Sequence, residues 1–310
     1  MEKKILVAVD TSNHSEKAVQ YAAEIYDTLK DVKFTLMHVQ PAISEYILDE
    51  AKKSPGAQTE LAKVMRKNND ASQQLLDKLR QKLTGAGVSA SGIEITTRPQ
   101  MLGVAKDILD YSVAGSFDAV ILGRRGLSGL AEYFVGSVSS NIVNNSDYIP
   151  VWLVDEKAPS KNIMVAVDGS ESSLKAVDHL AFMVGGNPDL KISFLHVTPR
   201  LTDVCPVDFG DSDTEALEEV IRQGDKDCID RFFSHALKRL KEAGIQESQI
   251  EVNSTEGLYR AGKAIMAAYR EGKFGALVVG RRGTGKKFFT GSVSRYLLDH
   301  FSEGALWVVP

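Results

Sequence analysis

Two short glycine- and arginine-rich stretches carry the residue types in this chain that are best suited to bind an anion. Gly-Arg-Arg-Gly occupies residues 123–126 and returns at 280–283, each time directly after an apolar run, and a Gly-Ser pair follows at 136–137 and 291–292. Glycine permits positive φ angles and close backbone approach, and a Gly-Ser pair at a helix start presents backbone amides and a hydroxyl. Converging amides at a helix N-terminus favour phosphate oxygens, so the pattern predicts a polyphosphate site.

Each part of this pattern also has a structural interpretation. Gly123 and Gly126 can form a strand-to-loop turn, and Ser137 can cap a helix, so the parts favour phosphate only in combination. The two copies differ in one respect, because nine residues separate Gly126 from Gly136 whereas seven separate Gly283 from Gly291. A shorter loop would draw the phosphate-binding amides away from the helix start. We therefore expect the second copy to bind nucleotide more weakly or not at all.

Elements that position these stretches recur in the same order, which indicates a tandem duplication. Val-Ala-Val-Asp appears at 7–10 and again at 165–168. Short apolar runs alternate with amphipathic stretches as β-α-β-α-β-α-β-α-β in each copy, which is typical of a parallel sheet covered by helices on both faces. We expect two doubly wound, Rossmann-like α/β domains, at 1–157 and 158–310, each with a five-stranded parallel sheet.

Two segments do not fit the alternating pattern. Residues 41–54 and 198–213 follow the second strand of each copy and are predicted to be solvated loops. The later segment contains several aspartates, but their spacing matches no calcium-binding loop, so we assign no metal ligands.

The composition argues against several classes of partner. The 310 residues carry a formal net charge of −4, with 43% hydrophobic and 25% charged residues, which suggests neither nucleic acid nor a membrane as a partner. The first apolar run stops at Asp10 and is too short to span a bilayer, so a cytoplasmic location is expected. Cys205 and Cys228 have no counterparts in the first copy and are interpreted as free thiols.

An Asp at the end of each first strand completes a pattern that resembles the ATP-binding universal stress proteins, over essentially the whole chain as two fused copies. In that family this Asp and the backbone near the Val that ends the second strand hold adenosine, and the glycine loop and Gly-Ser helix start hold ribose and phosphates. Carried over, the resemblance implies nucleotide contacts at Asp10, Val39, Gly123, Arg125, Gly126, Gly136, Ser137 and Val138, and in the second copy at Asp168, Val197, Gly280, Arg282, Gly283, Gly291, Ser292 and Val293. Asp10 can also cap the helix that follows it.

The resemblance implies a stress-response regulator in which ATP occupancy acts as a signal to an unidentified protein partner. It leaves open whether Mg²⁺ or Mn²⁺ accompanies the nucleotide. One alternative is an interaction or apolar-ligand module with degenerate nucleotide sites, and a further alternative is a slow ATP-hydrolysing enzyme. The Gly-x-Gly-x-x-Gly that follows the first strand of nicotinamide dehydrogenases is absent. No catalytic residue is assigned, because nucleophile elbows are also absent and no recurring group beyond the strand histidines is placed to act as a general base. His38 and His196 are interpreted as strand histidines satisfied by their neighbours.

The last strand of each copy is predicted to pair with its counterpart in the other copy. Val151–Val154 and Leu306–Val309 are strongly apolar and contain Trp152 and Trp307 at equivalent places. Because an unpaired edge of this character invites aggregation, we expect the two strands to pair in antiparallel fashion. Such pairing would make the chain an intramolecular pseudo-dimer, with a homodimer of the whole chain as a further option.

Overall fold

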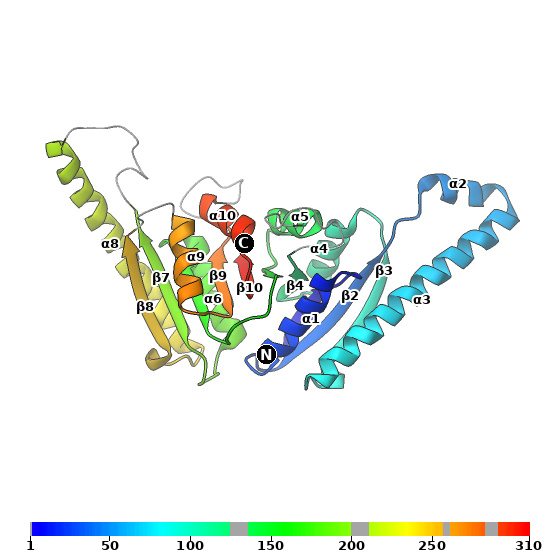
Figure 1. Cartoon of the computed structure of the whole chain (residues 1–310), viewed down its shortest axis with the longest axis horizontal. Helices are drawn as coiled ribbons and strands as arrows, with labels where there is room; N and C mark the ends of the chain where they lie inside the picture. Colours follow the sequence, from blue (N-terminus) through cyan, green and yellow to red (C-terminus); the bar gives the residue numbers. More distant parts are fainter. Residues whose placement is uncertain (1, 125–135, 200–210, 257–260, 283–290) are drawn as a thin grey trace. The chain divides into compact units, whose positions relative to one another are not determined.

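The computed structural model describes residues 2–124, 136–199, 211–256, 261–282 and 291–310 (Figure 1). The chain divides into two compact units. The first holds most of residues 1–154 and the second most of residues 155–310. We call them the first half and the second half.

The first half alternates strands and helices in the predicted order. Its elements are β1 (Lys3–Ala8), α1 (Asn13–Tyr26), β2 (Val32–Gln40), α2 (Glu45–Lys53), α3 (Pro55–Gly85), η1 (Ala90–Gly92), β3 (Ile93–Pro99), α4 (Val104–Ala114), β4 (Ala119–Gly123), α5 (Ser137–Asn145) and β5 (Val151–Val154). Its strands lie in the order β3-β2-β1-β4-β5, and every neighbouring pair is parallel.

The second half repeats this plan. Its elements are β6 (Ile163–Val167), α6 (Glu171–Val184), β7 (Ile192–Thr198), α8 (Asp211–Glu242), η2 (Glu247–Gln249), β8 (Ile250–Glu256), α9 (Ala261–Glu271), β9 (Ala276–Gly280), α10 (Ser292–His300) and β10 (Ala305–Val309). Its parallel strands lie in the order β10-β9-β6-β7-β8. The expected class, two doubly wound domains with five-stranded parallel sheets, is confirmed.

The direction of the strand order changes once in each sheet. In the first half the chain moves outward from β1 to β2 and β3, then returns to the other side of β1 for β4 and β5. Right-handed crossovers place the helices of these two moves on opposite faces, so α1 and α3 pack together on one face and α4 and α5 on the other. The carboxyl ends of β1 and β4 therefore flank the crevice in which open α/β sheets bind ligands.

The sheets form the centre of each core because their inner strands and the last strand of each half are strongly apolar. All of β4, β5, β6 and β10 is buried, and Trp152 and Trp307 are 0% exposed. Tyr21 packs edge-on against Trp152 at a ring-centroid distance of 6.5 Å, and His179 packs edge-on against Trp307 at 5.9 Å. No helix within the described part of the chain is long and apolar enough to cross a membrane.

The two predicted loops need correction. Residues 45–53 form α2, with Glu45 in its first turn and Lys52 and Lys53 in its last, as the helix dipole favours. Only Ala51 of this helix is buried, which explains why no apolar period revealed it. In the second half, residues 211–213 begin α8, and residues 200–210, with Cys205, lie outside the described part of the chain.

Candidate functional site

The first half contains a cavity of about 510 Å³ at the carboxyl ends of β1, β2 and β4. Its floor is apolar and includes Val9, Met37, Val39 and Leu122. Helices α3 and α4 supply further walls, and the start of α5 closes one end. A volume between about 300 and 1,000 Å³ with an apolar floor and a few polar groups is typical of a small-molecule site.

The start of α5 is the part of this wall that is best suited to an anion. Gly136 is the N-cap, and because glycine has no side chain, no cap hydrogen bond closes the helix end. The backbone nitrogen of Gly136 donates to the carbonyl oxygen of Arg124 at 2.8 Å, which joins the two ends of the glycine loop. The amides that follow have no intrahelical acceptor, and Ser137 and Val138 line the cavity. These amides and the positive end of the helix dipole suit phosphate oxygens.

Ser139 connects this helix to the sheet. Its hydroxyl is buried and donates to the carbonyl oxygen of Gly123 at 2.8 Å. Ser294 repeats the contact in the second half, donating to Gly280 at 2.7 Å. The bond holds the first turn of α5 over the end of β4, so the position of the exposed amides depends on it.

Gly123 is required for a reason different from the one expected. It is extended at the end of β4 and does not have a positive φ angle. A Cβ atom at this position would lie 2.7 Å from the backbone carbon and oxygen of His14 on α1. Gly280 has the same role, because its Cβ would lie 2.8 Å from the backbone carbon of Ser172 on α6. These two glycines therefore permit close packing between a strand and a helix; the structure gives them no part in a nest that depends on positive φ angles.

Asp10 lines the cavity and also organises the turn that follows β1. Its Oδ1 atom accepts hydrogen bonds from the Ser12 backbone nitrogen at 2.9 Å and from the Ser15 hydroxyl at 2.7 Å. The Ser15 nitrogen donates to Ser12, not to Asp10. Asp10 thus stabilises the entry to α1 through two serines without capping the helix directly, and its carboxylate stays at the cavity wall.

His38 is a neutral histidine with a defined hydrogen bond. The Ser72 hydroxyl donates to the Asn68 carbonyl at 2.8 Å, so it accepts from Nδ1 of His38, 2.9 Å away. Burial lowers the pKa of His38, against an opposing effect of the nearby Asp10 carboxylate. The expected interpretation of a satisfied strand histidine is confirmed, and the ring also lines the cavity.

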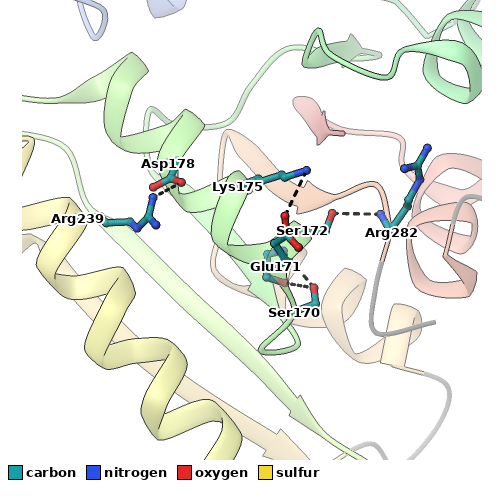
Figure 2. Close-up of polar contacts among 8 residues, drawn as sticks. Ser170, Glu171, Ser172, Lys175, Asp178, Arg239 and Arg282 are labelled. Atoms are coloured by element: carbon teal, nitrogen blue, oxygen red, sulfur yellow. Dashed lines mark hydrogen bonds and ion pairs between the residues drawn. The ribbon is translucent and has the colours of Figure 1, made fainter. Parts of the chain in front are cut away.

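In the second half the same turn follows the first strand, and a further hydrogen bond joins the end of β9 to α6. Figure 2 shows Ser172 beside the backbone nitrogen of Arg282, which donates to the Ser172 hydroxyl at 3.3 Å. Asp168 accepts from the Ser170 nitrogen at 3.1 Å and the Ser173 hydroxyl at 2.6 Å, as Asp10 does from its own two serines. The second copy therefore keeps the local bonding at the ends of β6 and β9.

The structure brings most of the first-half candidates together. Those that line the cavity are Asp10, Val39, Gly123, Gly136, Ser137 and Val138. Arg125, Gly126 and Gly283 lie outside the described residues. In the second half Asp168, Val197, Gly280, Arg282, Gly291, Ser292 and Val293 lie at the carboxyl ends of β6, β7 and β9 or at the start of α10.

Sequence reasoning missed the wall that α3 supplies. That wall consists of Asn68, Ala71, Ser72 and Leu75, spaced i, i+3, i+4 and i+7 along one helix face. The spacing was visible in the sequence, but it identifies one face of a helix without saying what that face covers.

A second hollow in the first half lies between α4 and α5 and contains no part of the β1 or β2 ends. It measures about 990 Å³ and shares only Val104, Ser137 and Val138 with the cavity. We assign the anion-binding geometry to the smaller cavity because that cavity also reaches Asp10 and Gly123. Across the described ranges, no three His, Cys, Asp or Glu side chains gather as a metal site.

Comparison with known proteins agrees with this geometry. The model of the Universal stress protein family matches residues 1–155 and again residues 159–310. A universal stress protein of Mycolicibacterium smegmatis is 26% identical over 212 residues, which cover 66% of this chain and 67% of that protein. The universal stress protein YxiE of Bacillus subtilis is 26% identical over 167 residues, which cover 50% of this chain and 99% of that protein.

The fold of the whole chain also has a solved counterpart. The crystal structure of a universal stress protein from Archaeoglobus fulgidus matches with a TM-score of 0.66 and 18% identity, covering 99% of this chain and 97% of that one. At this identity the likeness is one of fold.

Proposed function

Because the chain belongs to the universal stress protein family, as two tandem domains, we propose that its first half binds ATP and that occupancy of this site is a regulatory signal. The observation that carries the proposal is a single cavity that joins an apolar floor to the uncapped start of α5. An adenine ring suits the apolar floor, and a phosphate chain suits the amides of Ser137 and Val138. The cavity thus has an apolar region for the adenine ring and a separate polar region for the phosphates.

The signal would act in the cytoplasm on a protein partner that remains to be identified. A divalent cation such as Mg²⁺ or Mn²⁺ would accompany the phosphates, which supply the oxygen ligands that such ions prefer. The proposal is one of binding and not of turnover. Phosphate release from ATP that depends on a named cavity side chain would favour the slow ATP-hydrolysing alternative.

A charge reversal at the helix start tests the proposal. Ser137→Asp places a carboxylate beside the expected phosphates, where at about 5 Å and an effective dielectric of about 20 the repulsion is roughly 3 kcal/mol. ATP affinity of the full-length chain, measured by titration calorimetry, should fall at least about tenfold. Ser140→Asp, on the same helix but outside the cavity lining, is the matched control and should bind almost as the unaltered chain does.

Two results would contradict the proposal. One is an equal affinity for Ser137→Asp and Ser140→Asp, because the helix start would then have no contact with phosphate. The other is no ATP binding by the unaltered chain, together with no nucleotide in mass spectra of the freshly purified, denatured protein. That second result would favour the interaction or apolar-ligand module.

A further inference from the structure

The long helices α3 and α8 can be matched residue by residue. The Val88 nitrogen donates to the Leu83 carbonyl at 3.1 Å just beyond α3, and the Ile245 nitrogen donates to the Leu240 carbonyl at 3.0 Å just beyond α8. Leu83 and Leu240 are both fully buried. When the two helices are aligned on these leucines, each α3 residue of the cavity wall has an equivalent residue on α8. The pairs are Asn68 and Asp225, Ala71 and Cys228, Ser72 and Ile229, and Leu75 and Phe232.

The first consequence concerns the strand histidines. His196 donates from Nδ1 to the Val167 carbonyl at 3.0 Å, and its Nε2 lies 2.8 Å from the Asp225 carboxylate on α8. His196 is 3% exposed, whereas His38 is half-buried and lines the cavity. In the second half the histidine therefore bridges the end of β6 and the long helix, across the space that the cavity occupies in the first half.

Cys228 and Phe232 occupy more of the same space. A Cβ atom on Gly169 would lie 2.9 Å from the Cys228 sulfur, so this sulfur lies against the residue after Asp168. The first-half residue after Asp10 is Thr11, which lines the open cavity. Phe232 is 6% exposed and packs edge-on against Phe233 at 5.5 Å, where the first half has the smaller, half-buried Leu75.

The long helix is also held in this position by charge. Arg239 on α8 lies about three helix turns beyond Cys228. It pairs with Asp178 on α6, as Figure 2 shows. The corresponding contact in the first half is made by Glu16 on α1 with Lys78 and Lys82 on α3. Both long helices are thus fixed against their neighbours, and the difference between the halves comes from the side chains that they carry.

We propose that Asp225, Cys228 and Phe232 close the second half to purine nucleotides, so that the tandem chain holds one nucleotide and not two. The inference rests on the proposed ATP site of the first half. The three side chains fill the volume that a base would need, and Asp225 is held in that position by its 2.8 Å contact with Nε2 of His196. The closure comes from α8 and is independent of the shorter glycine loop.

Native mass spectrometry of the full-length chain with ATP and Mg²⁺ counts the nucleotides directly. The unaltered chain should hold one. The variant Asp225→Asn/Cys228→Ala/Phe232→Leu, which gives α8 the side chains of α3 at these three positions, should hold two. The reciprocal variant Asn68→Asp/Ala71→Cys/Leu75→Phe should hold none. Asp230→Asn, exposed on the same helix, is the matched control and should hold one.

Each other outcome has a defined meaning. A count that stays at one in the α8 variant overturns the closure, and so does a count of two in the unaltered chain. A count of two after only lengthening the interval between Gly283 and Gly291 by two residues overturns it in favour of loop length. A count of zero in the unaltered chain with one in the α8 variant contradicts the first-half site but supports the closure. If the α8 variant does not fold, Cys228→Ala alone and the reciprocal variant decide the question.

Discussion

The hydroxyl of Ser139 donates a 2.8 Å hydrogen bond to the carbonyl oxygen of Gly123, and this bond holds the first turn of α5 over the end of β4. It connects the helix start that faces the cavity to the rigid centre of the sheet. The same bond joins Ser294 to Gly280 in the second half. In both copies this contact joins the helix that follows the glycine loop to the strand that precedes it.

Ser139→Ala should therefore weaken both stability and ATP binding. Losing the donor leaves a buried carbonyl unsatisfied, which should lower the free energy of unfolding by about 1 to 2 kcal/mol. Ser140→Ala removes a half-buried hydroxyl on the same helix that accepts a long hydrogen bond, 3.4 Å, from Asn144, and should cost less than about 0.5 kcal/mol. Denaturant unfolding and calorimetry with ATP measure the two effects, and equal values for the two variants would contradict this role for Ser139.

Gly123→Ala should destabilise the first half because its Cβ would meet the backbone of His14 at 2.7 Å. Backbone atoms cannot rotate away, so the cost should be about 1 to 3 kcal/mol. Gly136→Ala is the comparison, since Gly136 has a φ angle of −56° that any residue adopts, and it should cost less than about 1 kcal/mol. Thermal unfolding without nucleotide separates the packing role from ligand binding. A Gly123→Ala protein as stable as Gly136→Ala would refute the packing explanation.

His179 should make the second half sensitive to acid. Burial lowers the pKa of His179 from 6.5 to about 3, so the folded chain holds this ring neutral while the unfolded chain protonates it below pH 6.5. The contribution of the neutral His179 ring to the free energy of unfolding is fully present above pH 6.5 and is lost as the pH falls toward about 3. Over this range the free energy of unfolding should change by up to about 1.4 kcal/mol per pH unit. His179→Leu should remove this part of the slope. Unfolding free energies measured at several pH values in that window test it, and parallel curves for the two proteins would rule it out.

Deleting Ala305–Pro310 should make the chain self-associate. The expected pairing of Val151–Val154 with Leu306–Val309 stays a prediction from the sequence, as does the pseudo-dimer that it would form. Removing one partner would expose an apolar edge of the first-half sheet, and edges of this kind pair with other copies. Light scattering should show a larger mass per particle than for the full-length chain. An unchanged mass would contradict the pairing.

The sequence by itself determined the duplication, the order of the elements and most of the first-half candidates. Apolar runs of β-strand length lead to buried strands, as in Val151–Val154, because side chains buried on both faces leave a continuous hydrophobic signal. The glycine and Gly-Ser positions could be placed near each other because parallel strands end at one edge of the sheet. Helix α2 was missed because a surface helix with one buried residue leaves no such signal.

Only the tertiary structure decided which side chains surround the candidate site. Asn68 lies 28 residues and Ala71 lies 31 residues beyond Gln40, the end of β2. A helix period identifies one face of a helix without identifying the element opposite to it. For the same reason the sequence analysis attributed the expected difference in nucleotide binding between the halves to the length of the glycine loop alone. The structure adds Asp225 and Cys228 on α8, which meet His196 and Gly169 only after the helix packs over the end of β6. The volume of a cavity depends on side chains that come from segments far apart in the sequence. The spacing of residues within one segment therefore does not predict whether the cavity is open.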